Sequence, residues 1–167
     1  MELNYLMPVQ VIAGQDAVTR NSHLFRALGG RCLIVTGRHS AKACGALADV
    51  TAALEQEGIA WDVFDKVEQN PLLSTCVEGG RAAAAFGADF LVGIGGGSPL
   101  DATKAIAVFA TNDMDPMELY QPRKAPPLPF ILVGTTAGTG SEVTRYSVLT
   151  LDETGRKRSW GDRGSYA

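Results

Sequence analysis

The sequence of 167 residues has only two histidines and three cysteines, so few side chains of the types that hold transition metals are present. The cysteines, Cys32, Cys44 and Cys76, are widely spaced and include no C-x-x-C pair, which argues against a zinc site and predicts reduced thiols in a cytoplasmic protein. His23 and His39 have no second ligand at helical spacing. We therefore expect no catalytic set and no metal site in this sequence.

Long apolar runs and a strong excess of charge are also lacking. No apolar stretch approaches the roughly 20 residues that a helix needs to cross a bilayer, and residues 1–14 contain no apolar core of a signal peptide. The formal net charge of −3 gives no overall attraction to nucleic acid or to an anionic membrane. The composition, 46% hydrophobic and 20% charged, is that of one globular domain. We expect neither nucleic acid nor a membrane as a partner.

What is present is an alternation of strand and helix patterns. Short apolar runs predict strands at residues 9–12, 32–36, 59–64, 90–94 and 130–133. Helical periodicity predicts helices at residues 15–28, 43–54, 74–86 and 98–109. The pattern predicts an α/β fold with a Rossmann-like parallel sheet and helices on both faces. A proline-rich linker is expected at 122–129, and a β-hairpin at 146–160 with its turn at 152–155.

The segment 90–109 carries the strongest functional signal. A buried strand is followed by the glycines 95–97, which allow a tight turn and a close approach of a ligand. Ser98 suits the N-cap of the next helix and Pro99 its first position. That helix presents one apolar face, formed by Ala102, Ala105, Ile106 and Phe109. Free N–H groups and the positive end of the helix dipole meet at this turn, which predicts a phosphate site.

The glycine loop matches none of three common motifs. Ser98 stands where the dinucleotide pattern G-x-G-x-x-G needs its third glycine, the Gly-Lys-Ser/Thr ending of a P-loop is missing, and Leu100 replaces the last glycine of a nucleophile elbow. A second loop, 134–142, adds hydroxyl groups after another buried strand. Two loops at one sheet edge suit the two ends of a dinucleotide. Tight packing, with threonines that bond their own backbone, is the alternative.

The segments GGGSPLDATKAIA at 95–107 and TTAGTGSEVTRYSVLT at 135–150 resemble the iron-containing (group III) alcohol dehydrogenases, and the resemblance extends from Pro8 to the hairpin. It implies an N-terminal α/β domain that binds NAD or NADP. It also implies an all-helical C-terminal domain with a divalent metal, usually iron, that polarises the alcohol or carbonyl oxygen during hydride transfer. Since that helical domain is absent, we expect residues 1–167 to be a truncated cofactor-binding domain, inactive on alcohol by itself. Family resemblance further suggests a homodimer and a small alcohol or aldehyde substrate.

The resemblance also assigns cofactor-binding roles by position. The pyrophosphate would be held at the first loop, which Asp101 helps to order, by Gly95, Gly96, Gly97 and Ser98. The adenosine side would be lined by Asn70, Thr135 and Thr136. The nicotinamide half and its ribose would meet Thr139, Thr144, Val148 and Lys157.

One departure from the family bears on the choice of cofactor. Relatives that prefer NAD carry an aspartate after the second strand, whereas this chain has Gly37-Arg38-His39-Ser40. With no carboxylate at Gly37, a 2′-phosphate is not repelled, and Arg38 or Ser40 can bind it. We therefore expect a preference for NADP(H) over NAD.

Two other identities remain open at this point. One is a non-catalytic nucleotide-binding or assembly module. The other is a relative of glycerol dehydrogenase or dehydroquinate synthase, which are similar in fold but match the second motif less well.

Overall fold

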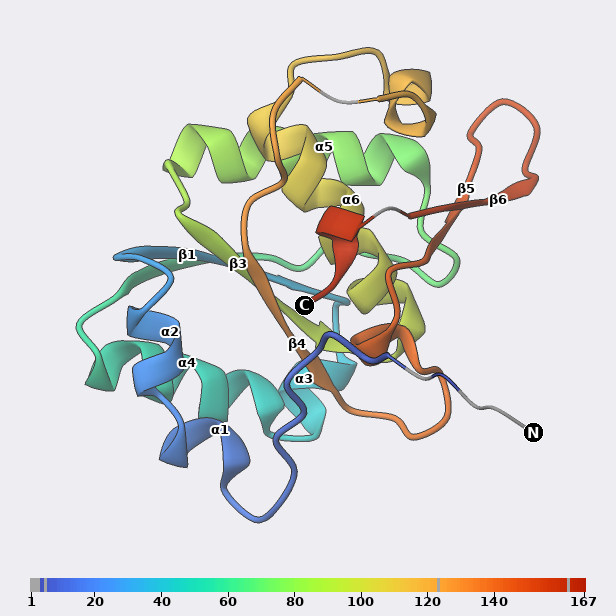
Figure 1. The fold of residues 1–167 in the computed structure, drawn as a ribbon. Coiled ribbons are helices and arrows are strands. Elements are labelled where there is room, and N and C mark those ends of the chain that lie inside the picture. Colours follow the sequence, from blue (N-terminus) through green and yellow to red (C-terminus); the bar gives the residue numbers. More distant parts are fainter. Residues whose placement is uncertain (1–3, 5, 123, 162) are drawn as a thin grey trace.

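A four-stranded parallel sheet forms the centre of the molecule, with strand order β2-β1-β3-β4 (Figure 1). The structure is a computed structural model that describes residues 4, 6–122, 124–161 and 163–167. The strands are β1 (Arg31–Thr36), β2 (Ala60–Phe64), β3 (Phe90–Gly95) and β4 (Phe130–Gly134). The four strands expected at these places are thereby confirmed.

Helices cover both faces of the sheet, as predicted (Figure 1). One face carries α5 (Leu73–Phe86) and α6 (Gly97–Thr111). The other carries the short helices and α4: α1 (Ala17–Arg20), α2 (His23–Arg26), α3 (Ser40–Ala43) and α4 (Ala46–Gln56). Within the described residues there are also three 3₁₀ turns: Pro116–Tyr120, Ser141–Val143 and Arg163–Ser165.

The central strand β1 shows why an unbroken apolar run was needed. Leu33 and Val35 belong to the hydrophobic cluster under α5 and α6, whereas Cys32 and Ile34 belong to the cluster under α2 and α4. Successive side chains point to opposite faces, so a strand covered on both sides must be apolar at every position. β2 lies at the edge of the sheet, and its first three residues are exposed.

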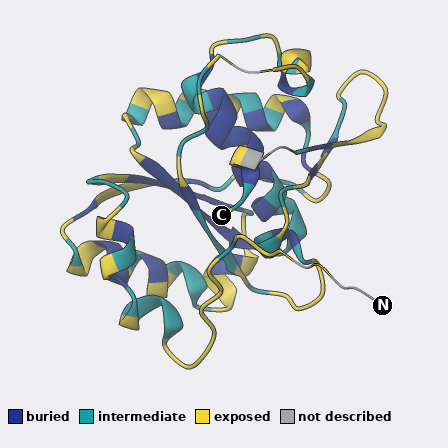
Figure 2. Cartoon of the chain, in the orientation of Figure 1, coloured by how far each residue is buried: buried dark blue, intermediate teal, exposed yellow. Residues whose placement is uncertain are grey.

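Helix α6 is enclosed far more completely than its sequence suggested (Figure 2). The expected apolar face is buried, but Thr103, Lys104, Ala107 and Val108 are buried as well. β3, α5 and the hairpin pack around it. Close approach to α5 depends on Gly79 and Gly80, because a Cβ at these positions would lie 2.6 Å from Ile106 Cδ1 and 2.4 Å from Phe109 Cβ.

Several expected elements are wrong near the N-terminus. Residues 9–12 form no strand, and Val11 is 56% exposed. The expected helix 15–28 is divided into α1 and α2, because the Asn21 side chain donates to the Ala17 carbonyl where a helix would continue. The helix expected from residue 43 is interrupted at Gly45, whose φ of 85° is left-handed.

The predicted hairpin is confirmed: β5 (Ser147–Thr150) pairs antiparallel with β6 (Lys157–Trp160). The expected linker 122–129 has no regular structure where it is described, and residue 123 lies outside the described residues. The Asn112 side chain holds the linker near the end of α6, since its amide exchanges two hydrogen bonds with the Ala125 backbone.

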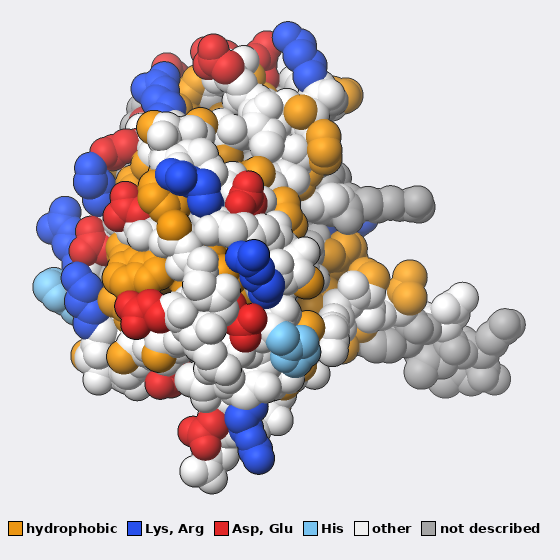
Figure 3. Space-filling view, turned by 90° about the vertical axis from the view of Figure 1, so that its left-hand side faces the viewer, with side chains coloured by type: hydrophobic (Ala, Val, Ile, Leu, Met, Phe, Trp, Pro, Cys, Tyr) orange, Lys and Arg blue, Asp and Glu red, His pale blue; other side chains and the backbone are white. Residues whose placement is uncertain are grey.

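Acidic and basic side chains are interspersed over the face shown in Figure 3. Among the helices of the described residues, none combines the length and the apolar character that crossing a membrane requires.

Candidate functional site

The loops named by the sequence begin side by side at one edge of the sheet. Thr36 at the end of β1 pairs with Ile94, and Gly95 at the end of β3 pairs with Gly134 at the end of β4. Since the strands are parallel, Gly37, the glycine loop and the loop 134–142 all leave the carboxyl edge together. This is the edge at which open α/β sheets bind ligands.

The glycine loop turns directly into α6. Gly95 has a φ of 148°, and a Cβ there would lie 2.7 Å from Pro99 Cγ. The N-cap is Gly96 rather than the expected Ser98, and it provides no side-chain cap; Pro99 consequently falls at the third helical position instead of the first. Ser98 Oγ instead accepts a hydrogen bond of 3.2 Å from the Asn70 N–H. The N–H groups of Gly97 and Ser98 at the start of α6 therefore have no side-chain cap, as an anion site requires.

The second loop lies against the first. The Thr135 N–H donates to the Gly95 carbonyl at 2.9 Å. A Cβ at Gly96 would lie 3.1 Å from Thr136 Oγ1, and one at Gly97 would lie 3.5 Å from Thr139 Cγ2. The two threonine side chains thus lie directly beside the glycines that begin α6, and we call this arrangement of glycines and threonines the cradle. Its N–H groups and hydroxyls are of the kind that donate hydrogen bonds to a diphosphate.

Asp101, in α6, joins that helix to both the second loop and the hairpin. Its carboxylate accepts a hydrogen bond from Ser141 Oγ at 2.6 Å and another from the Val148 N–H at 3.0 Å. Its backbone carbonyl accepts from Ser147 Oγ at 2.8 Å. The loop that Asp101 orders through these bonds is therefore the second one, together with the start of β5.

Lys104 is a residue of this network whose role was not foreseen. Its side chain is fully buried, and Nζ donates to the carbonyls of Ser141 at 2.8 Å and Tyr146 at 2.6 Å and to Ser141 Oγ at 2.9 Å. Nζ also lies 3.7 Å from the Asp101 carboxylate. Burial lowers the pKa of Lys104, and the charges of Asp101 and Glu142 oppose that shift. The sequence signal that could have revealed this role is the single lysine within the apolar run of α6, because a lysine is rarely buried without a partner for its charge.

The hairpin places Val148 and Lys157 on one face. Val148 is opposite Ser159 and Thr150 is opposite Lys157, and directly opposed residues share a face of the sheet. Thr150 Oγ1 in turn donates to the Asn70 carbonyl at 3.1 Å, and Asn70 bonds Ser98, so this face lies next to the end of the glycine loop. The other face, with Ser147, Leu149 and Trp160, is buried.

The remaining predicted residues are not drawn into the cluster. Arg38, Ser40 and Thr144 are exposed, and no hydrogen bond within the described part of the chain joins them to the glycine loop. Gly37 stands at the correct edge, and a Cβ there would lie 3.2 Å from the Val67 carbonyl oxygen.

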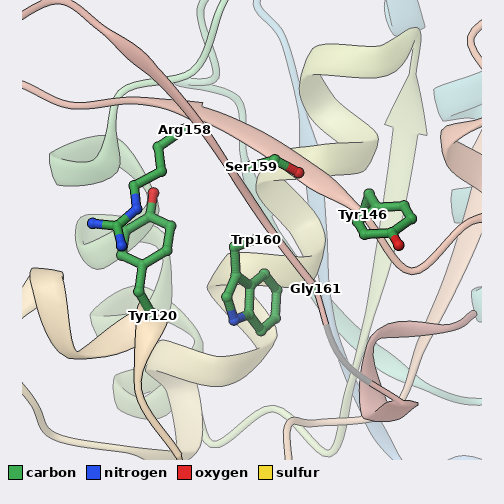
Figure 4. A pocket seen from close by; sticks show the side chains of 6 residues that line it. All are labelled: Tyr120, Tyr146, Arg158, Ser159, Trp160 and Gly161. Carbon is green, nitrogen blue, oxygen red and sulfur yellow. The ribbon is translucent and has the colours of Figure 1, made fainter.

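A pocket of about 310 Å³ lies elsewhere, beside the hairpin; it is lined by Tyr120, Tyr146, Arg158, Ser159, Trp160 and Gly161 (Figure 4). In it the Arg158 guanidinium carbon lies 3.9 Å from the centre of the Tyr120 ring. The pocket contains none of the predicted residues. Across the described ranges, no three His, Cys, Asp or Glu side chains gather as a metal site would need, so these residues do not fit an iron centre.

Comparison with known proteins gives consistent matches. Lactaldehyde reductase of Escherichia coli (strain K12) is 39% identical over 131 residues, which is 76% of this chain and 34% of the relative. The probable NADH-dependent butanol dehydrogenase 2 of Bacillus subtilis (strain 168) is 36% identical over 159 residues, 94% of this chain and 41% of the relative.

Solved structures agree in fold. An iron-containing alcohol dehydrogenase of Thermotoga maritima, 39% identical, matches 95% of this chain and 44% of its own with a TM-score of 0.88. Sulfoacetaldehyde reductase of Bifidobacterium kashiwanohense in complex with NAD+ is 28% identical. It matches 99% of this chain and 44% of its own chain, with a TM-score of 0.85.

The chain thus spans 34% to 41% of these curated relatives. The family model of the iron-containing alcohol dehydrogenases matches residues 8–167, nearly the whole sequence. With that match and the shared fold, the chain belongs to the iron-containing alcohol dehydrogenase family.

Proposed function

We propose that residues 1–167 form the domain that binds a nicotinamide dinucleotide in an alcohol or aldehyde oxidoreductase. The observation that carries the proposal is the glycine cradle at the start of α6, with its uncapped helix terminus and two flanking threonines. The relatives support it: two are named as NADH-dependent butanol dehydrogenases, and a matching solved structure holds NAD+.

In this role the chain binds and orients the cofactor. The N–H groups of Gly97 and Ser98 hold the diphosphate, and the hydroxyls of Thr136 and Thr139 close over it. The exposed face of the hairpin, with Val148 and Lys157, meets the nicotinamide half. When bound, the dinucleotide supplies or accepts the hydride.

Metal chemistry is not assigned to these residues, because the described part of the chain gathers no ligand set. By itself the chain is therefore proposed to bind cofactor without oxidising alcohol. The iron, the small alcohol or aldehyde substrate and a homodimer belong to the proposal for the whole protein, by resemblance to the family.

A finer part of the proposal is a preference for NADP(H). Gly37 offers no carboxylate at the end of β1, and the exposed Arg38 next to it provides a cation for a 2′-phosphate. The Bacillus subtilis butanol dehydrogenase is named as NADH-dependent and the sulfoacetaldehyde reductase structure contains NAD+, so this preference would set the chain apart from those two relatives.

Isothermal titration of the purified chain with NAD+ and NADP+ tests the proposal, with Gly96→Val and Ala48→Val as matched variants. Both variants carry the same valine side chain, but Gly96 lies in the cradle and Ala48 is exposed on α4. We expect wild type and Ala48→Val to bind equally, and Gly96→Val to bind at least about tenfold more weakly because the cradle is filled. Circular dichroism checks that each variant is folded. A folded wild-type chain that binds neither dinucleotide would overturn the proposal.

A further inference from the structure

We propose that Lys104 is a positioning residue for cofactor binding, which fixes the second loop on α6 and supplies the countercharge to Asp101 beside the diphosphate cradle. The inference rests on the proposed function, since it concerns how the same site holds an anion. Lys104 lies about two turns along α6 from the glycines of the cradle and need not touch the cofactor.

The geometry shows what Lys104 fixes. Its ammonium donates to the carbonyls of Ser141 and Tyr146, which lie in the segment that joins the end of the second loop to β5. Asp101 binds Ser141 Oγ and the Val148 N–H at either side of the same segment. Six hydrogen bonds from Asp101 and Lys104, one turn apart on α6, therefore hold residues 141–148. The preceding part of the loop, with Thr136 and Thr139, is anchored at its other end by the Thr135 bond to Gly95.

The charges explain why this position is a lysine. The Asp101 carboxylate lies in the first two turns of the helix whose N-terminus would hold the diphosphate, so alone it would repel the ligand. Lys104 Nζ, 3.7 Å from that carboxylate, makes the pair neutral. The other carboxylate facing this region is that of Glu142, which also accepts a 3.3 Å hydrogen bond from Thr139 Oγ1.

A purely structural role gives a weaker account of Lys104. Its side chain is fully buried, and a buried ammonium loses hydration that hydrogen bonds to neutral carbonyls replace only in part. An apolar side chain would fill the same volume without that cost. The charge of the lysine is therefore better explained by its place, next to an acidic residue at the proposed anion site.

The test compares Lys104→Met, the double variant Asp101→Asn/Lys104→Met, and Lys124→Met as a control. Lys124 is an exposed lysine of the linker at the opposite end of α6. Titration with NADP+ and NAD+ gives affinities, and competition by inorganic pyrophosphate and by adenosine separates the anionic from the neutral part of the ligand. Hydrogen exchange of residues 141–148 reports the loop without any ligand.

We expect Lys104→Met to weaken binding of pyrophosphate by about tenfold or more, to weaken adenosine much less, and to speed exchange in residues 141–148. The double variant should recover at least part of the pyrophosphate affinity, although it removes a further hydrogen-bonding group, because the unpaired negative charge is gone. Lys124→Met should match wild type. Raising the salt concentration should reduce the loss of pyrophosphate affinity in Lys104→Met.

Two results would overturn the charge role. One is an equal loss of affinity for pyrophosphate and for adenosine in Lys104→Met, and the other is a double variant that binds pyrophosphate more weakly than Lys104→Met does. Wild-type affinity in a folded Lys104→Met would overturn the inference while leaving the proposed function intact, whereas a wild-type chain that binds no dinucleotide overturns both. Should Lys104→Met fail to fold, Asp101→Asn alone decides: the charge role predicts a higher ratio of pyrophosphate to adenosine affinity than in wild type, and an unchanged or lower ratio contradicts it.

Discussion

Asp152, in the turn of the hairpin, accepts hydrogen bonds from both the backbone N–H and the hydroxyl of Ser74 in the first turn of α5, 78 residues away. The N–H bond measures 3.0 Å. The N-cap position of this helix is Leu72, which has no capping side chain. A carboxylate from the hairpin therefore satisfies a free N–H of α5, where a negative charge also meets the positive end of the dipole.

Replacing Asp152 by alanine should lower the free energy of unfolding by about 1–2 kcal/mol, because the helix loses a capping acceptor and the hairpin loses a tether. Urea denaturation followed by circular dichroism measures this. Glu153→Ala, at the exposed neighbouring residue, is the control and should stay within about 0.5 kcal/mol of wild type. Equal effects of the two substitutions would show that the Asp152 bonds contribute nothing.

Alanine at Gly79 or Gly80 should destabilise the chain even though alanine favours helices by about 1 kcal/mol. At Gly80 the new Cβ would meet the backbone carbon of Phe109 at 2.8 Å, which cannot move aside alone. At Gly79 it meets the end of the Ile106 side chain, which can rotate. We expect a loss of about 1–3 kcal/mol for Gly80→Ala and a smaller loss for Gly79→Ala in urea denaturation. A stabilised Gly80→Ala would contradict this account of the α5–α6 contact.

Gly37→Asp should shift the preference of the chain from NADP+ toward NAD+ by about tenfold or more, because a carboxylate at the end of β1 repels a 2′-phosphate and accepts from a 2′-hydroxyl. Gly37→Ala is the steric control, since its Cβ makes the same 3.2 Å contact with the Val67 carbonyl oxygen and adds no charge. Titration with NADP+ and NAD+ gives the ratio of the two affinities. If Gly37→Ala and Gly37→Asp change this ratio equally, the effect is steric and the electrostatic reason is wrong.

Only one of the three thiols should react readily with iodoacetamide in the native chain. Cys44 is exposed, whereas Cys32 and Cys76 are fully buried, and burial raises the pKa of both thiols well above the ordinary value. A raised pKa keeps these groups protonated and unreactive at pH 8, because the thiolate is the nucleophile. Mass spectrometry should find a single modification at Cys44, and three in urea. Rapid native labelling of Cys76 would show that α5 opens readily.

The strands around the site were predictable because burial on both faces leaves little choice of residue. Leu33 and Ile34 pack into the hydrophobic clusters on opposite faces of the sheet, so both positions are apolar. Such an apolar run predicts a strand even when the neighbouring strands are not known. The places of the two loops followed from the parallel order, since strand ends share an edge. The hairpin could also be predicted, because its turn residues and the β patterns on either side of them are close together in the sequence.

What could not be predicted depends on contacts between distant residues. The start of α5 is set by Asp152, and Ser98 bonds Asn70 instead of capping α6. Lys104 finds its acceptors 37 and 42 residues farther along the chain. Residues 9–12 have the composition of a strand but acquire no partner among the described strands, and pattern alone cannot reveal that absence.

The enclosure of α6 from Pro99 to Phe109 has a thermodynamic consequence for any ligand at its N-terminus. A helix held by hydrophobic packing on so many sides has its backbone already ordered before an anion arrives, so association loses little conformational entropy there. The residues that become ordered on binding are then exposed ones such as Thr136 and Thr139. The enthalpy and entropy of complex formation should therefore report on the ordering of that loop.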